Sequence, residues 1–307
     1  LEGRVQDDTW FAYIATIDES DDPFDESVWI KANPNLGVSV KWDDMRRLAK
    51  KAEQLPTALN NFLTKRLNVW TQQETRWIPL DIWDENAGET PAKELEERLK
   101  GVTCYGGLDL GSVSDLSAWV MVFPWPDSDD LDVIARFWCP ETRLYDEENR
   151  YRYQYQAWAR EGWLTATPGR AIDYGFIKQQ IIRDATQYGL VDFNVDRLFQ
   201  AHQLSVELID EGLTVVGMGQ GFVSMAAPMS EFERRLLHGQ IHHGNNPVLR
   251  WMAGNVAVKQ DAAGNLKPDK ATSQGKIDGI VALVMALDRA MRHEAPSTSV
   301  YAERGVR

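Results

Sequence analysis

The sequence has few cysteines, no long apolar run and no signal-peptide pattern, which excludes several classes of protein. The 307 residues include only two cysteines, Cys104 and Cys139, which is too few for a zinc framework or a secreted disulfide scaffold. The longest apolar run, 277–287, contains Asp278 and is shorter than the ~18 residues of a membrane span. No apolar stretch follows a basic one at the start, so no signal peptide is indicated. We expect a reducing cytosolic setting and a fragment of a longer protein.

Positive charge is also scarce. Lys and Arg number 33 against 46 Asp and Glu, and the net charge of −13 counts against a simple electrostatic binder of nucleic acid. The deficit is uneven, because residues 1–230 hold 22 basic and 38 acidic side chains, whereas residues 231–307 hold 11 and 8. Carboxylates that hold metal ions also make a chain acidic, and the cation then reverses the local field. Composition therefore leaves nucleic acid open without favouring it.

The first hundred residues have mixed character. We expect a strand at 10–17, a basic amphipathic helix at 43–54 that continues helically over 57–69, a polar connector at 71–91, and a short helix at 92–100. This part of the chain therefore reads as a helical and linker segment that precedes a denser pattern.

From residue 102 onward the pattern predicts a mixed α/β domain. Strands at 103–110, 117–123 and 131–138 are joined by short links of turn composition, which favours an antiparallel meander. Helices and further strands then alternate, with helices at 146–160, 174–188, 203–210, 224–237 and 275–292 and strands at 191–195 and 213–216. Three antiparallel strands followed by helix-linked parallel strands are typical of the RNase H-like fold, a mixed sheet of five strands flanked by helices. Residues 239–274 read as an elaboration before the last helix.

Three aspartates fall at positions where carboxylates can converge. Asp109 ends the first strand, Asp196 ends the fourth, and Asp278 lies in the first turn of the last helix. Carboxylates that meet at one point repel each other unless cations neutralise them, and Mg²⁺ or Mn²⁺ prefers such oxygen ligands. Two such ions stabilise the attacking water and the leaving oxygen of a phosphodiester. Asp115, which follows the Gly111 turn, is a candidate auxiliary ligand.

Each aspartate also has a purely structural interpretation. A single Asp at a strand end usually caps a turn or the following helix, and Asp278 would complement the helix dipole. Only the joint placement of the three carboxylates favours a metal site.

The residues around these aspartates resemble a known family. The segments GLDLGSVSDLSAWVMVFP, VDFNVDR, QGFVSMAAPMSEFERRLLHG and KPDKATSQGKIDGIVALVMAL, in that order, are similar to the nuclease domain of the large terminase subunit of tailed bacteriophages. Upstream, WIKANPNLGVSV and FLTKRLNVW resemble the segment that joins the ATPase domain of that family to its nuclease. The resemblance implies that residues 1–90 are the tail of the ATPase domain and a linker, and that residues 91–307 are the RNase H-like nuclease.

The resemblance also implies an activity and its residues. The family cuts concatemeric viral DNA with a cluster of acidic residues and two divalent ions, Mg²⁺ or Mn²⁺. Asp109, Asp196 and Asp278 match its catalytic, metal-binding acids, and Asp115 matches an additional acidic position. The implied partners are double-stranded DNA, the small terminase subunit, the portal protein and the chain's own ATPase domain, in the host cytoplasm at the portal vertex of the procapsid. No membrane and no place in the mature virion are implied.

One motif of the family is missing. Its motor half needs a G-x-x-x-x-G-K-[ST] phosphate loop, and the nearest fragment, Gly275-Lys276-Ile277, has neither the upstream glycine nor the hydroxyl. We therefore expect no ATP hydrolysis or DNA translocation by this chain alone.

Several basic residues are candidates for contact with DNA phosphates. Lys276 lies beside Asp278, and the region after residue 239 has a positive cast from Arg250, Lys259, Lys267 and Lys270. A solvated helix end is the simpler interpretation of Lys276. The histidines at 238, 242 and 243 lack the spacing of a metal site and favour a partly exposed turn. Asp173 reads as the N-cap of the next helix.

Two other functions stay open. The domain could be a docking platform for the portal or small terminase with an idle nuclease, which metal titration would distinguish. The segment Asp109-Leu110-Gly111-Ser112 also resembles the first phosphate loop of the actin and sugar-kinase ATPases. That superfamily needs a second glycine-rich loop after a later Asp, and the residues after Asp196, RLFQAHQ, contain no glycine.

Overall fold

The computed structural model describes residues 13–18, 20–54, 62–69, 77–111, 115–196, 200–261 and 263–293. The chain divides into two compact units, residues 1–74 and residues 75–307, which are treated separately below. This division falls earlier than the expected boundary at residues 90 and 91. The functional assignment of the two segments stays a prediction.

The first unit is a small helical body. Its described elements are η1 (Glu26–Val28), α1 (Trp29–Ala32), α2 (Trp42–Gln54) and a helical turn at 62–66. Trp29, Met45, Phe62 and Leu67 are buried in its core. The helix predicted at 43–54 is confirmed. Of the helical continuation predicted at 57–69, residues 62–66 are helical, and residues 57–61 lie outside the described residues.

The strand predicted at 10–17 is wrong for the residues that the structure describes. Residues 13–17 form no strand, and residues 10–12 lie outside the described part. Tyr13 and Ile14 are exposed, so this apolar run finds no sheet on which to bury a face. The basic stretch at 41–51 lies on α2, where Arg46 pairs with Glu26 and Arg47 with Asp44 at the surface, as a solvated helix face would.

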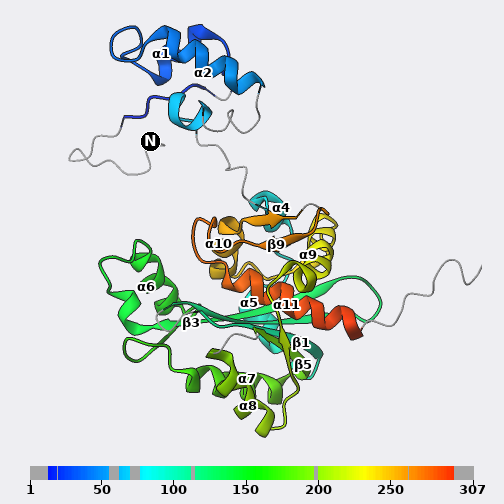
Figure 1. Ribbon diagram of the computed structural model, residues 1–307. Coiled ribbons are helices and arrows are strands. Elements are labelled where there is room, and N and C mark those ends of the chain that lie inside the picture. The colour runs from blue at the N-terminus through cyan, green and yellow to red at the C-terminus, as the bar shows by residue number, and fades with distance from the viewer. Residues whose placement is uncertain are drawn as a thin grey trace, which may run out of the picture. The chain divides into compact units, whose positions relative to one another are not determined.

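The second unit is built on a mixed sheet, and the predicted fold class is confirmed (Figure 1). An antiparallel meander forms its centre: β1 (Thr103–Asp109), β2 (Ser117–Pro124) and β3 (Leu131–Pro140). Next to β1 lies the parallel strand β5 (Gly189–Asp196), and next to β5 lies the parallel strand β6 (Val215–Met218). Two short strands, β4 (Thr165–Thr167) and β7 (Ile241–His242), pair with β3 and extend the five predicted strands to seven.

Helices cover both faces of this sheet (Figure 1). One face packs against α5 (Ala92–Arg98), α7 (Tyr174–Gln187) and α8 (Gln200–Asp210). The other packs against α9 (Phe222–Leu237), α10 (Pro247–Asn255) and α11 (Asp278–His293). The side chains of β2 alternate as a strand between two layers requires, because Val120 and Val122 face α11 whereas Trp119 and Met121 face the opposite layer.

Two predicted helices begin later than expected. The helix predicted at 146–160 is α6 (Arg152–Glu161), which follows a 3-10 turn, η2 (Glu141–Leu144). Side chains of Asp146 and Asn149 accept hydrogen bonds from the backbone N–H groups of Glu148 and Tyr151, so these residues form turns rather than a helix. The last helix begins at Asp278 rather than at residue 275.

The connector predicted at 71–91 contains a helix. Residues 71–76 lie outside the described part, but α4 (Leu80–Glu85) packs on α9 and α10 and buries Trp83. The elaboration at 239–274 comprises β7, α10 and a hairpin of β8 (Val258–Gln260) and β9 (Leu266–Pro268). Across the described ranges, no helix is long and apolar enough to cross a membrane.

The close approach of α11 to β1 depends on one glycine. A Cβ added to Gly107 would lie 2.0 Å from the backbone oxygen of Ala282. Only glycine therefore allows the helix to lie this near the strand, which brings the first turn of α11 to the end of β1.

Candidate active site

Two of the predicted aspartates end neighbouring parallel strands. Leu108 of β1 is the register partner of Val195 of β5, so Asp109 and Asp196 come next on adjacent strands at the same edge of the sheet. The preceding side chains, Leu108 and Val195, are buried in the layer of α7 and α8. Because successive side chains alternate between faces, Asp109 and Asp196 both lie on the α11 face.

The third aspartate, Asp278, is brought beside Asp109 by the start of α11. The ammonium of Lys270 links the two, with its Nζ 2.7 Å from Asp109 Oδ2 and 3.1 Å from Asp278 Oδ1. The other oxygen of Asp109 accepts a hydrogen bond from Gln220 Nε2 at 2.8 Å. Both carboxylates are buried, with Asp109 0% and Asp278 5% exposed.

Asp278 is the electrostatically strained member of this pair. Burial, reinforced by the nearby charges of Asp109 and Asp115, outweighs the attraction of Lys270 and raises its pKa to about 7. Its Oδ2 atom is buried and has no hydrogen-bond partner. Burial lowers the pKa of Lys270, but the attraction of Asp109 and Asp278 outweighs it and holds that pKa above its usual value. The site therefore has a surplus of negative charge that one ammonium only partly neutralises.

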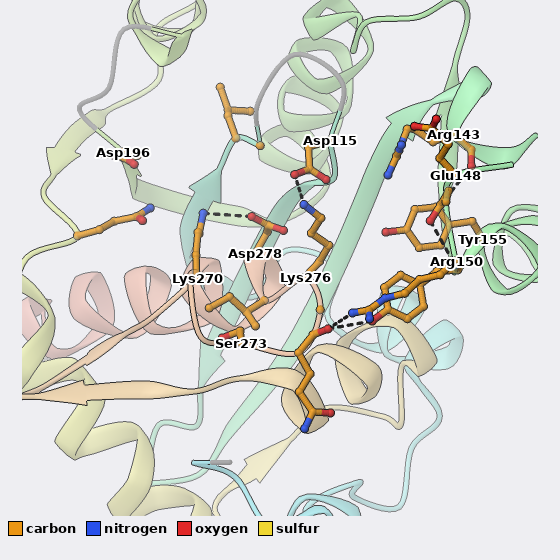
Figure 2. A pocket seen from close by; sticks show the side chains of 18 residues that line it. Asp115, Arg143, Glu148, Arg150, Tyr155, Asp196, Lys270, Ser273, Lys276 and Asp278 are labelled. Atoms are coloured by element: carbon orange, nitrogen blue, oxygen red, sulfur yellow. Dashed lines mark hydrogen bonds and ion pairs between the residues drawn. The ribbon is translucent and has the colours of Figure 1, made fainter. Parts of the chain in front are cut away.

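Asp115 and Asp196 border the same cleft, which has a volume of about 890 Å³ (Figure 2). Asp115 is paired with Lys276, which immediately precedes Ile277 and Asp278. In the view of Figure 2, the side chains of Asp196, Lys270, Asp278 and Lys276 follow one another across the cleft. Asp115, Asp196 and Asp278 thus line this cleft, and Asp109 is buried behind it, bonded to Gln220 and Lys270 of the lining.

The residues present fit a hard divalent cation, although the carboxylates are not arranged around one. Within the described ranges, no group of three or more His, Cys, Asp and Glu side chains is placed to hold a metal ion. The Lys270 ammonium occupies the position between Asp109 and Asp278 instead. The buried, unpartnered oxygen of Asp278 is nevertheless the kind of donor that Mg²⁺ or Mn²⁺ takes.

The opposite wall of the cleft was not found from the sequence. It is formed by Arg143, Glu148, Arg150, Tyr151 and Tyr155, from the turns after β3 and the start of α6 (Figure 2). No motif marks these residues, and only the course of the chain after β3 brings them here. Gln220, which donates to Asp109, was also missed, because it lies in a short loop between β6 and α9.

The five basic candidates are divided by the structure. Lys270 and Lys276 line the cleft. The other three do not line it: Arg250 is bound to Asp84 of α4, Lys259 pairs with Asp269, and Lys267 lies over the ring of Phe222. Whether these three border the path of DNA stays a prediction.

The histidines at 238–243 form separate contacts. His243 is buried and stacked on Trp83, which departs from the expected partly exposed turn. His242 contacts Asp130, and His238 lies exposed at the end of α9. Asp173 is an N-cap, as predicted, since its carboxylate accepts a hydrogen bond from the backbone N–H of Gly175.

The strand order and the acidic cleft define the class of protein. Three antiparallel strands continued through β1 into parallel β5 and β6, with carboxylates at the ends of β1 and β5, are the RNase H-like arrangement that the sequence predicts. The chain belongs to the family of terminase large subunit endonuclease domains, whose family model matches residues 4–294.

The chain is also similar to individual proteins and solved structures, two of which are named as large terminases. Protein YmfN of Escherichia coli K12 is 34% identical over 312 residues, which cover 97% of this chain and 67% of that protein. The large terminase subunit of Enterobacteria phage HK97 is 35% identical over 265 residues, which cover 85% of this chain and 51% of that protein. The crystal structure of the HK97 large terminase has a TM-score of 0.61 at 32% identity and covers 90% of this chain and 56% of that one.

These relatives are longer than this chain, which spans between about half and two thirds of their length. A more distant likeness is the large terminase nuclease from thermophilic phage G20c with bound magnesium, at 13% identity and a TM-score of 0.38, covering 66% of this chain and 98% of that one. Membership of the family implies a hydrolase of phosphodiester bonds.

Proposed function

We propose that this chain is a metal-dependent endonuclease that hydrolyses the phosphodiester bonds of double-stranded DNA. In this proposal Asp109, Asp196 and Asp278 are the catalytic acids and hold two divalent ions, Mg²⁺ or Mn²⁺, with Asp115 as an auxiliary ligand. The observation that supports it most is the pair of buried carboxylates, Asp109 and Asp278, which share one ammonium while an oxygen of Asp278 has no partner. Buried acids without full compensation are costly to a fold and are typical of functional sites.

The residues of the cleft divide the work between metal and substrate. When bound, the two ions supply a water nucleophile and stabilise the leaving 3′ oxygen. The carboxylates of Asp109, Asp196 and Asp278 would hold the ions, and Gln220 orients Asp109 through its hydrogen bond. On the opposite wall, the guanidinium groups of Arg143 and Arg150 are suited to phosphate oxygens of the DNA backbone.

The family to which the chain belongs supports a proposal for its natural substrate and its assembly. We propose that the substrate is concatemeric phage DNA, cut during packaging at the portal vertex of the procapsid in the host cytoplasm. The small terminase subunit, the portal protein and an ATPase domain of the same protein would be the partners. Membership of the terminase family and the 35% identity to the HK97 large subunit support this assignment.

Cleavage of supercoiled plasmid tests the activity. We expect nicking and linearisation with Mg²⁺ or Mn²⁺, none with EDTA, and loss of cutting in Asp196→Asn. The matched control is Asp173→Asn, which removes an acid outside the cleft and keeps a side chain that caps α7. Cutting in EDTA, or equal cutting by Asp196→Asn and the natural chain, would contradict the proposal.

A non-catalytic docking domain is the second candidate. It is favoured by Lys270, which occupies the position between Asp109 and Asp278 where a ligand ion would be expected. In that case Mn²⁺ would bind no more tightly to the natural chain than to Asp196→Asn, and neither protein would cut DNA.

A further inference from the structure

One lysine occupies the centre of the acidic cleft. The Nζ atom of Lys270 is 2.7 Å from Asp109 and 3.1 Å from Asp278, and both of these carboxylates are almost wholly buried. The ammonium therefore bridges the two acids that we assign to metal binding. A divalent cation bound by the same two oxygens, Asp109 Oδ2 and Asp278 Oδ1, would take the place of the ammonium.

A second lysine repeats the arrangement nearby. Lys276 is paired with Asp115, and it comes from the same segment as Lys270, residues 269–277, which we call the lysine segment. Asp115, Asp196 and Asp278 thus line the cleft, and Asp109 is buried behind it in contact with Lys270. The two lysines contact three of these four aspartates. Both positive charges come from one segment between β9 and α11.

The backbone of the lysine segment is fixed at several points. The N–H of Asp269 donates to Ala257 O at 2.8 Å, and the N–H of Gln274 donates to Asn255 O at 3.3 Å. On the other side, the carbonyl of Gln274 accepts from the hydroxyl of Tyr151 at 3.0 Å and from the guanidinium of Arg150. A lysine side chain has four rotatable bonds, so its ammonium can leave the acids without movement of this anchored backbone.

We propose that Lys270 is a built-in counterion that holds Asp109 and Asp278 together until a divalent ion displaces it. The inference rests on the proposed function, because it assumes that these acids bind metal. A compact ammonium suits this role better than a guanidinium, since it neutralises both acids without the two-point grip that arginine makes on one carboxylate. The acids stay assembled without metal, and metal binding is weakened by the loss of the two ion pairs. Lys270 is in this sense a positioning residue.

Calorimetric titration of Mn²⁺ into the whole chain tests the displacement. We expect Lys270→Met and Lys270→Gln to bind Mn²⁺ about tenfold more tightly than the natural chain, because no ion pair has to break. Lys270→Arg, which keeps the charge, should not tighten binding. The matched control is Lys267→Met, which removes a nearby positive charge that does not touch the acids and should change the affinity less than about twofold.

Thermal unfolding gives a readout that does not depend on cleavage. In EDTA, Lys270→Met should melt about 5 °C below the natural chain, because Asp109 and Asp278 lose their counterion. Saturating Mn²⁺ should close this gap, since the metal then replaces the ammonium. A gap that stays the same with metal would mean that Lys270 is only structural.

The outcomes separate this inference from the proposed function. If the natural chain binds Mn²⁺, Asp278→Asn does not, and Lys270→Met binds equally or more weakly, the metal site stands and the counterion proposal is overturned. If neither the natural chain nor Lys270→Met binds Mn²⁺, the metal site itself fails, and the displacement fails with it.

Discussion

Buried aspartates lie at both ends of α11, but they differ in their hydrogen-bond partners. At its C-terminal end, Asp192 of β5 and Asp288 of α11 are 4% and 6% exposed, which matches the burial of Asp109 and Asp278 at the other end. Asp192 is bound by Arg289 and by His293, and Asp288 is bound by Arg292 and by Asn194. The two pairs of aspartates are thus similarly buried but differ in their partners. Asp192 and Asp288 have their own cationic partners, whereas Asp109 and Asp278 share one lysine, and an oxygen of Asp278 has no partner.

The difference also appears in the charge states. Burial acts to raise the pKa of Asp192, but hydrogen bonds from Arg289 and His293 outweigh it and hold that pKa below its usual value. At Asp278 burial wins over Lys270, and the pKa rises to about 7. Arginine thus closes a structural ion pair, whereas lysine leaves the acids of the cleft open to another cation. Burial of an aspartate alone therefore does not identify a functional site, and the partners of its carboxylate have to be considered.

The largest expected effect comes from removing a charge at the cleft end. Asp278→Asn should lower metal-dependent cleavage of plasmid by about 1,000-fold, which corresponds to about 4 kcal/mol in activation free energy. Its melting temperature in EDTA should not fall, because burial already disfavours the charge of Asp278 more than its ion pair with Lys270 favours it, as its raised pKa indicates. Plasmid cleavage assays and thermal unfolding on one preparation check both parts. A strongly lowered melting temperature with normal cleavage would place Asp278 among the structural acids.

The same substitution at the other end should have the reverse effect. Asp192→Asn leaves Arg289 without its carboxylate and should lower the free energy of unfolding by about 3 kcal/mol. Cleavage per folded molecule should be unchanged, because Asp192 does not line the cleft. Urea unfolding measures the first quantity, with the exposed Asp210→Asn as control. If Asp192→Asn lost cleavage but kept its stability, the aspartates at the two ends of α11 could not be divided into structural and catalytic ones.

The positions of the acids could be predicted from the sequence because the alternation of apolar residues shows where each strand ends. Asp109 and Asp196 end strands whose alternation is plain, and the order of the elements makes those strands neighbours. The counterion could not be predicted in the same way. Lys270 lies in an irregular segment, where spacing along the chain does not determine which atoms meet, and it was expected only as a DNA contact.

Several short helices and strands could not be predicted from the sequence for a similar reason. The strands β4 and β7 have three and two residues, and α4 has six, so none is long enough to show a period. They form because longer neighbours offer them partners, as β3 does for β4 and β7. The wall of Arg143 and Arg150 likewise depends on the tertiary course of the chain after β3.

A buried histidine, His243, shows that burial can also keep a titratable side chain neutral. His243 donates from Nε2 to Trp83 O at 2.7 Å and accepts at Nδ1 from the N–H of Asn245, and burial lowers its pKa from 6.5 to about 4. An unfolded chain binds this proton near pH 6.5 and the folded chain only near pH 4, so stability falls as the pH drops through that window. The loss should reach about 3 kcal/mol by pH 4.

Urea unfolding between pH 7.5 and pH 4 checks the contribution of His243. His243→Gln should have a shallower decline of unfolding free energy with falling pH, whereas exposed His238→Gln should follow the natural chain. Parallel declines for all three proteins would assign the acid sensitivity to other groups.

The smallest effect is expected from an arginine that faces the cleft instead of closing a buried pair. Arg143 of η2 pairs with partly exposed Asp146, and it lines the wall opposite the acids. Arg143→Met, made in the inactive Asp196→Asn background, should weaken binding of a DNA duplex by about three- to tenfold and reduce the slope of log affinity against log salt by about one. Fluorescence anisotropy at several salt concentrations measures both, with exposed Arg160→Met of α6 as control. An unchanged salt slope would mean that Arg143, like Arg289, serves only the fold, and contact with DNA phosphates would then be left to Arg150 and the lysines of the cleft.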